Sequence, residues 1–402
     1  MTEAIQCQKQ IDELLNLPQQ SWLLGAGISK NAGIPLMLPL TDRVEAILVG
    51  DHKHVFQSIR AQLHDTSHVE HILSHIGDLI AIADRAKGKS VDIGGTNRVA
   101  EELDKLHASI QEAIRETMRW GYVPACGETP EHIGCKDAPI VSIDEHIRFV
   151  EALFRARRAG LERRPPVGFF TINYDTLLED ALALCRIAAV DGFSGGSMAF
   201  WEPGHEIDDP FRSDAKIQAR IYKLHGSIDW VVSSEDVVVR RRDGAGYPSD
   251  SEARLLIYPQ ATKYKVTQRD PFATLFAAYR AALVDSQPGL LAICGYSFGD
   301  DHINEEIERA LRQRENRLTV LAFVSQDSSR LTEPCQGLPP VLIKWLSSDS
   351  GPWKERIIVA GSHGIYHGSL ENRCPAEVQT PHGWWSFEGV TQLLRHGPEV
   401  EA

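Results

Sequence analysis

None of the seven cysteines in this sequence stands in a C-x-x-C pair. Zinc ribbons and zinc fingers take their ligands from such pairs, and a disulfide framework shows as a regular set of cysteines in a short secreted chain. We therefore expect no zinc, no other bound metal and no disulfide framework.

Long apolar runs are missing too. No run approaches the roughly 20 residues of a membrane-spanning helix. The first ten residues, Met1 to Gln10, are polar and lack the apolar stretch of a signal peptide. The sequence therefore predicts no membrane contact and a cytoplasmic location.

An excess of positive charge is also absent. The formal net charge is -13, whereas a broad nucleic-acid surface needs clustered lysine and arginine to neutralise phosphates. We expect no such surface. With 402 residues, of which 43% are hydrophobic, the chain is long enough to bury a large core in one or two domains.

What the sequence does contain is a set of short apolar runs of strand type, at residues 21–24, 167–170, 221–224 and 290–294. Strands that alternate with helical stretches favour an α/β fold with a Rossmann-like parallel sheet. Ligands bind such sheets at the carboxyl ends of the strands. The polar or glycine-containing segments that follow the four runs are therefore expected to form one site.

The first of these segments is Gly25-Ala26-Gly27-Ile28-Ser29, which leads toward an expected helix. Glycines let the backbone turn tightly and approach a ligand, and N–H groups at a helix start can hold a pyrophosphate. The segment therefore suits a dinucleotide. The next glycine is Gly33, so the G-x-G-x-x-G spacing of dehydrogenases is not met.

The second segment places Asn173 and Asp175 just after a predicted strand. Asparagine offers a donor and an acceptor to sugar hydroxyls, and an ionised aspartate accepts from an amide. Alternatively, both residues cap the helix expected from Thr176, as Asn and Asp often do. We favour a ligand role for Asn173 and leave Asp175 open between the two.

The other two segments contain His225 and the stretch Gly295-Tyr296-Ser297-Phe298-Gly299-Asp300. Imidazole has an unperturbed pKa of about 6.5, so a neutral His225 can accept a proton from a hydroxyl or from water. A lone histidine is more often structural. Asp300 stands where a helix is expected to begin, and acidic residues there complement the helix dipole.

Together, in this order, the four segments resemble the sirtuin superfamily, and in particular its bacterial sirtuin-like NADase branch. The resemblance implies NAD as the substrate. Asn173 would hold the nicotinamide ribose or orient a water molecule, Asp175 would accept from the carboxamide, and His225 would be the general base. It also implies that a further set of residues contacts NAD: Gly25, Ala26, Gly27, Ser29, Gly295 and Ser297.

Two departures from the deacetylase sirtuins favour hydrolysis over deacylation. Leu36-Met37-Leu38 stands where deacetylases carry Asp-Phe-Arg, and no four-cysteine zinc module is present. We therefore predict an NAD hydrolase that releases nicotinamide and ADP-ribose. A protein deacylase or ADP-ribosyltransferase, and a non-catalytic NAD or ADP-ribose sensor, stay as alternatives. The resemblance further implies an antiphage effector that forms a homo-oligomer and has a HerA-type ATPase as a partner.

The pattern of hydrophobic residues divides the chain into three parts. Residues 1–44 and 161–346 are predicted to form the sirtuin-like Rossmann domain, and helical periodicity predicts a helical insertion over residues 45–160. Within it, residues 87–96 read as a polar loop. Residues 347–402 form a C-terminal appendage of uncertain fold. Further strands are expected at residues 318–324, 341–345 and 356–360, the first two completing the parallel sheet.

One constellation in the insertion is a row of histidines, His64, His68, His71 and His75, spaced four, three and four. On a continuous helix they would lie along one side and could bind a metal or act as a pH-dependent contact. A new helix starting near Ser67 would break the row. We interpret them as polar-face or interface residues.

Overall fold

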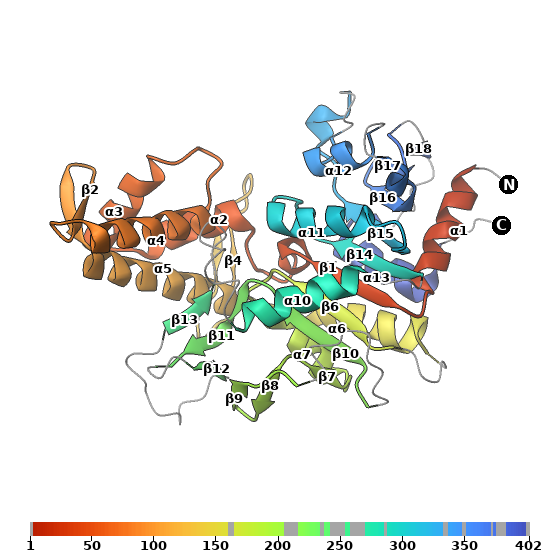
Figure 1. Cartoon of the computed structure of the whole chain (residues 1–402), viewed down its shortest axis with the longest axis horizontal. Coiled ribbons are helices and arrows are strands. Elements are labelled where there is room, and N and C mark those ends of the chain that lie inside the picture. Colours follow the sequence, from red (N-terminus) through yellow and green to blue (C-terminus); the bar gives the residue numbers. More distant parts are fainter. Residues whose placement is uncertain are drawn as a thin grey trace.

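The computed structural model describes residues 3–159, 165–204, 216–233, 237–241, 254–257, 270–284, 288–332, 337–347, 351–370, 373–374 and 383–398. Figure 1 shows a lobe of helices at one end, in orange, beside a larger α/β part that contains both ends of the chain. The α/β part is built on one sheet, and the site segments lie where this sheet faces the helical lobe.

Within the described residues, nine strands form the central sheet in the order β18-β17-β16-β15-β14-β1-β6-β10-β7. Their bounds are β1 (Gln20–Leu24), β6 (Val167–Thr171), β7 (Ala189–Val190), β10 (Ala219–Lys223), β14 (Gly289–Cys294), β15 (Leu318–Val324), β16 (Ile357–Gly361), β17 (Gly364–His367) and β18 (Arg373–Cys374). Neighbours from β16 to β7 pair in parallel, and β17 and β18 add an antiparallel edge. The predicted Rossmann-like parallel sheet is confirmed.

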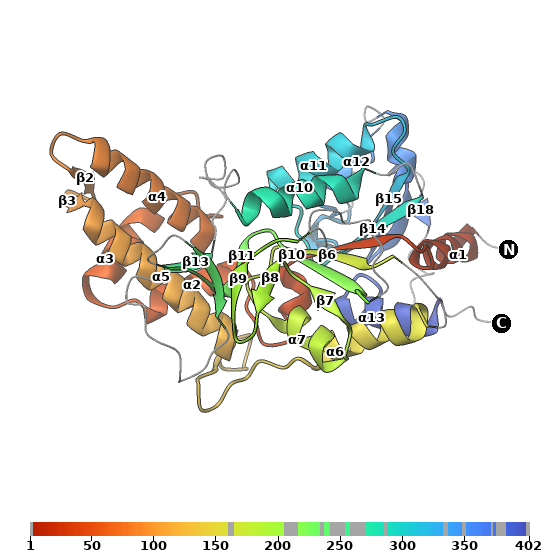
Figure 2. The same ribbon diagram turned by 60° about the horizontal axis from the view of Figure 1, so that its bottom comes forward.

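Helices cover both faces of this sheet (Figure 2). One face carries α1 (Glu3–Leu15), α6 (Asp144–Glu151) with a π-helical continuation (Ala152–Arg157), α7 (Leu177–Leu184) and α13 (Phe387–His396). The other carries α10 (Phe272–Leu283), α11 (Asp301–Leu311) and α12 (Pro340–Trp345). In β6, Phe169 belongs to the first core and Phe170 to the second. Strands buried on both faces are nearly continuous apolar runs, which is why the sequence shows no alternation here.

A second, antiparallel sheet has the order β13-β11-β12-β9-β8. Its strands are β8 (Phe193–Gly195), β9 (Met198–Trp201), β11 (Gly226–Val232), β12 (Val238–Arg241) and β13 (Arg254–Ile257). The sequence patterns do not predict this sheet. Because β10 ends at Lys223 and β11 begins at Gly226, His225 lies at the junction of the two sheets.

The helical lobe consists of α2 (Met37–Ile47), α3 (Gly50–Arg60), α4 (Val69–Arg85) and α5 (Ala100–Trp120), with the short hairpins β2 (Ser90–Ile93) with β3 (Thr96–Val99) and β4 (Tyr122–Val123) with β5 (His132–Ile133). The apolar stripes of α4 and α5 face each other in a separate core. Tyr174, Leu177 and Ile228 of the α/β part belong to the same core. The lobe is therefore packed directly against the segment that contains Asn173 and Asp175.

The strand predicted for residues 341–345 is wrong. These residues lie in helix α12, which begins at Pro340 and buries Leu342 and Trp345 against the sheet. Proline suits the first turn of a helix, and burial of two side chains three residues apart outweighs the local strand preference of Val341. The strand that pairs in parallel with β15 in place of residues 341–345 is β16. The 3₁₀ helices η4 (Ser328–Arg330) and η6 (Pro352–Arg356) lie in the segments that connect β15, α12 and β16.

Two other local predictions also need correction. The helix expected after Gly27 is only a 3₁₀ helix, η1 (Ala26–Ser29), and the next helix begins at Met37. Pro35 restricts the residue before it and lacks an N–H, which disfavours a continuous helix here.

The loop predicted over residues 87–96 contains most of the β2–β3 hairpin. Its turn is formed by Gly94 and Gly95, both with positive φ, as two-residue hairpin turns require.

The division into residues 1–44 with 161–346, 45–160 and 347–402 stays a prediction about domains. β16 and β17 of the last segment continue the central sheet, and α13 packs on α6. No helix among the described residues is long and apolar enough to cross a membrane.

His146 on α6 is fully buried, with its ring 5.1 Å from the Phe387 ring, and neither of its nitrogens has a hydrogen-bond partner among the described residues. Burial lowers the pKa of His146 below its usual value, although the nearby Asp175 carboxylate opposes this shift. The folded protein therefore holds a proton on His146 less readily than the unfolded chain does.

This burial predicts a loss of stability in acid. Since the unfolded chain binds the His146 proton more tightly, the folded state should lose stability as the pH falls below about 6.5, by up to about 1.4 kcal/mol per pH unit. Between pH 7 and pH 5, the variant His146→Phe should lose less stability than the parent in urea unfolding. The same substitution at the exposed His54 serves as control. Equal losses in the parent and His146→Phe would show that His146 does not cause the effect.

Candidate active site

The four predicted segments begin at one edge of the central sheet. In the registered strand pairs, Leu24 of β1 lies opposite Cys294 of β14 and Thr171 of β6, and Thr171 lies opposite Lys223 of β10. The chain winds from β1 toward β7 on one side and returns to β14 on the other. The segments therefore surround the switch point of the sheet, where open α/β folds bind ligands.

Gly25, Gly27 and Gly295 bring two of the loops into backbone contact. The Gly25 N–H donates to the Cys294 carbonyl at 3.0 Å, and the Gly27 N–H donates to the Gly295 carbonyl at 2.8 Å. A Cβ on Gly25 would lie 2.6 Å from the Gly295 oxygen, and one on Gly295, whose φ is +68°, would lie 2.5 Å from the Ile28 nitrogen. The glycines are thus required by the approach of the loops to each other, and these two N–H groups are not free for a pyrophosphate.

Ser29 links the first segment to the second. Its fully buried hydroxyl donates to Asp175 Oδ2 at 2.9 Å and accepts from Asn173 Nδ2 at 3.1 Å. This arrangement fixes the Asn173 amide with its nitrogen toward Ser29. Asn173 Oδ1 is buried and has no partner among the described residues. Buried acceptors are normally satisfied, so Asn173 presents an oxygen suited to a hydroxyl, an amide or a water molecule of a bound substrate.

Asp175 uses both carboxylate oxygens inside the protein. Oδ2 accepts from Ser29, and Oδ1 accepts from the Leu177 N–H at 3.1 Å at the start of α7. Asp175 therefore stabilises the start of α7 from the position before its N-cap, Thr176. Contact with a carboxamide stays a prediction. The same loop is held by Lys223, whose ammonium donates to the Asp175 carbonyl and pairs with Glu179 at 2.9 Å.

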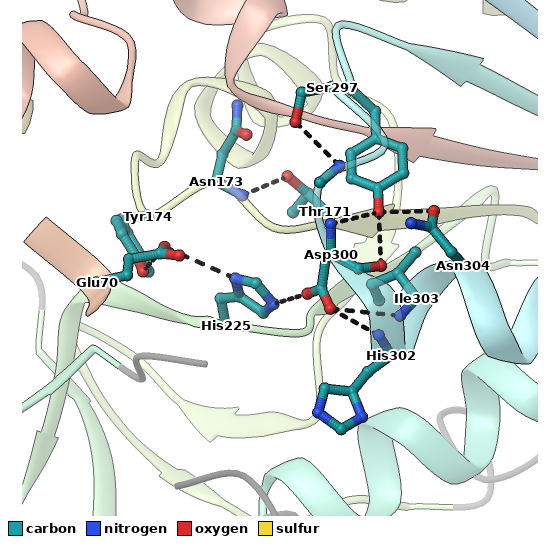
Figure 3. A network of polar contacts seen from close by, with 12 residues as sticks. Glu70, Thr171, Asn173, Tyr174, His225, Ser297, Asp300, His302, Ile303 and Asn304 are labelled. Carbon is teal, nitrogen blue, oxygen red and sulfur yellow. Dashed lines mark hydrogen bonds and ion pairs between the residues drawn. The ribbon is translucent and has the colours of Figure 1, made fainter. Parts of the chain in front are cut away.

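His225 is 2% exposed and lies between two carboxylates (Figure 3). Its Nε2 is 3.0 Å from Asp300 Oδ2, and its Nδ1 is 4.0 Å from Glu70 Oε1. Asp300 is also the N-cap of α11, because its Oδ1 accepts from the His302 and Ile303 N–H groups. The Asp300 carboxylate thus caps a helix and orients the imidazole at the same time.

This geometry assigns different roles to the two ring nitrogens. An ionised carboxylate only accepts, so Asp300 favours the tautomer with the proton on Nε2. Nδ1 then carries the lone pair, and it is the atom that can take a proton from a substrate. The Tyr296 hydroxyl supports Asp300 by accepting from its N–H at 3.2 Å.

The partner of Nδ1 comes from the helical lobe. Glu70 lies on α4 and is 5% exposed, and the Tyr174 hydroxyl donates a hydrogen bond to its Oε1. Burial, followed by the Glu70 carboxylate, raises the pKa of Tyr174 well above 10, so the phenol stays a donor. Sequence reasoning missed Glu70 and Asp300 as partners of His225, because 155 and 75 residues separate them from it and no spacing rule links such distant positions.

The remaining predicted contacts are less enclosed. Ala26 is half-buried, and Ser297 is exposed, with its Oγ accepting from the Gly299 N–H at 3.3 Å. The exposed His302 side chain points away from His225 (Figure 3). NAD contacts by Ala26, Gly295 and Ser297 stay predictions.

Residues 167–337 match the SIR2-like domain family. The chain carries a SIR2-like domain. Over these residues the chain is similar to the sirtuin superfamily, and the match suggests an NAD-dependent activity. It includes Asn173, His225 and Asp300 and excludes residues 25–29 and the helical lobe. No curated protein matches the chain.

The histidine row beside the SIR2-like domain is broken. Helix α4 begins at Val69, so His64 lies outside it and His68 is its N-cap. The His71 Nδ1 accepts from the His68 N–H at 3.1 Å. Among the residues that the structure describes, no group of three or more His, Cys, Asp or Glu side chains is placed to hold a metal. The row is therefore interrupted by the start of α4, as a helix beginning near Ser67 would predict.

Two exposed cysteines, Cys126 and Cys135, begin similar turns. Cys126 and Cys135 each pair their backbone with the residue three positions later, Thr129 and Ala138. In a C-x-x-C zinc turn, a second thiolate would stand at those positions. Each turn therefore has one of the two thiolates that a C-x-x-C turn contributes to the four ligands of a zinc site.

Purified protein is expected to contain no stoichiometric zinc. Treatment with a chelator should leave both the unfolding midpoint and the turnover of NAD unchanged, since neither turn can complete a tetrahedral site. Elemental analysis of the protein measures the metal content directly. One zinc ion per chain would contradict this expectation and reopen the question of the histidine row.

Proposed function

We propose that the protein hydrolyses NAD at the bond between nicotinamide and ribose, giving nicotinamide and ADP-ribose. The observation that carries this proposal is the pairing of His225 with Asp300 beside Asn173, whose buried Oδ1 lacks a partner among the described residues. His225 follows β10, and Asn173 follows the neighbouring strand β6. Asn173, His225 and Asp300 lie in the part of the chain that matches the SIR2-like domain, and this match supports the use of NAD.

The chemistry needs few groups. The bond from ribose C1′ to the pyridinium nitrogen breaks, its electron pair stays on that nitrogen, and nicotinamide leaves as a neutral molecule. The sugar passes through an oxocarbenium-like state, as in glycoside hydrolysis. The oxygen of a water molecule then bonds to C1′, and the water gives its proton to His225 Nδ1. Asn173 Oδ1 accepts from the water or from a ribose hydroxyl and so orients the reaction.

Incubation of the purified protein with NAD alone tests this proposal. Equal amounts of nicotinamide and ADP-ribose support hydrolysis. Nicotinamide release that depends on an acylated peptide would indicate a deacylase, and transfer of ADP-ribose to an acceptor would indicate a transferase. Binding of NAD without release of nicotinamide would indicate a sensor and would overturn the proposal.

We further propose that this activity serves antiphage defence by depleting cellular NAD in the cytoplasm. The support is the likeness of the four site segments to the sirtuin-like NADase branch. On the same ground, we propose a homo-oligomer that binds a HerA-type ATPase. Co-expression with the product of a neighbouring gene, followed by mass measurement, tests the assembly. A monomer that binds none of the products of neighbouring genes would count against this assembly.

A further inference from the structure

The helical lobe contributes a side chain to the candidate active site. Glu70 on α4 and Asp300 before α11 face opposite nitrogens of the His225 ring, at 4.0 and 3.0 Å. Both carboxylates are buried, at 5% and 2% exposure. Further titratable groups face these acids: Tyr174 donates to Glu70, the Tyr296 hydroxyl accepts from the Asp300 N–H, and His68 lies near Glu70. The imidazole is therefore placed between two buried acids that come from different parts of the chain.

A carboxylate in this position acts on the protonated ring. When His225 Nδ1 takes a proton, the ring becomes a cation, and a negative charge about 4 Å away stabilises it far more in a buried site than in water. The distance between Glu70 Oε1 and Nδ1 is too long for a hydrogen bond. Nδ1 thus keeps its lone pair for a substrate while the charge of Glu70 stays close.

We propose that Glu70 is a positioning residue for the base: it stabilises the cation that His225 becomes when it accepts a proton. The assignment rests on the proposed function, since it concerns the same histidine. It also gives the helical lobe a chemical role. Because Glu70 is carried by α4, a displacement of this helix would change the turnover of NAD.

Glu70→Gln tests this role with little change of shape. The amide can still accept from Tyr174, but the negative charge is gone. We expect kcat to fall about tenfold with KM nearly unchanged, because the charge matters once His225 is protonated in the transition state. The acidic limb of the kcat profile should move to lower pH, because protonation of the free base is disfavoured. Glu70→Asp should recover part of the rate. Asp84→Asn, on the exposed side of the same helix, should behave like the parent.

A measurement without turnover separates this proposal from the proposed function. NMR of the His225 ring protons follows its titration in the parent and in Glu70→Gln, whether or not NAD is cleaved. The midpoint should move down by about one pH unit, a factor of ten in proton affinity. An unchanged midpoint and an unchanged pH profile would overturn the role of Glu70. A shifted midpoint in a protein that never releases nicotinamide would keep the electrostatic role and reject the hydrolase.

Discussion

Replacing Asn173 or His225 by alanine is expected to lower kcat for nicotinamide release by about 10²–10³, or roughly 3–4 kcal/mol. Asn173 supplies the buried Oδ1 that has no partner within the described residues, and His225 supplies Nδ1 as the base. Both side chains are held by neighbours, Ser29 and Asp300, that stay in place. The variants should therefore keep the parent's fold and its oligomeric state.

The double variant is expected to be little worse than either single one. If Asn173 orients the water and His225 takes its proton, each residue works only when the other is present, so the two losses do not add. His302→Ala is a suitable control, since this histidine is exposed and points away from His225. Full turnover in a folded double variant would remove both residues from the mechanism.

Asp300→Asn should lower kcat by about 10³, with KM close to that of the parent, because the substitution changes the tautomer of His225. An amide nitrogen facing Nε2 donates where the carboxylate accepted, and this moves the ring proton to Nδ1. The base then has no lone pair where the substrate needs it. Asparagine is as good an N-cap as aspartate, so α11 should still begin at the same place.

The matched control for Asp300→Asn is the same substitution at the neighbouring Asp301, whose side chain is exposed. Asp301→Asn should retain the parent's rate, and thermal unfolding should show that both variants are folded. If Asp300→Asn also retained the parent's rate, the orientation of His225 by Asp300 would not matter, and the assignment of Nδ1 as the base would be wrong.

The sequence predicts the position of the site better than its internal contacts. Apolar runs such as β6 and β14 are recognisable because both of their faces are buried, and the segments that follow them meet at one edge of the sheet. Side chains that come from distant parts of the chain leave no such pattern. Glu70 reads as one polar residue of an amphipathic helix, and only the packing of α4 on Tyr174 brings it to His225.

Local composition also fails to predict the secondary structure at positions where tertiary packing determines it. The run at residues 341–345 favours a strand by composition but forms α12, because the preceding prolines start a helix and Trp345 is buried on the sheet. The glycines of the site loops show a second limit of prediction from sequence. Gly25, Gly27 and Gly295 were expected to make room for a nucleotide, and in the structure they make room for each other's backbone. The sequence cannot distinguish these two causes, since both need a residue without a side chain.

The most direct test of hydrolysis at this site is NAD cleavage in water labelled with ¹⁸O, followed by mass spectrometry of the products. The parent protein should release nicotinamide and ADP-ribose in equal amounts, with one ¹⁸O atom in each ADP-ribose, since water attacks ribose C1′. His225→Ala and Asp300→Asn should release almost none. Absence of nicotinamide with the parent, ADP-ribose without the label, or undiminished release by His225→Ala would contradict hydrolysis at this site.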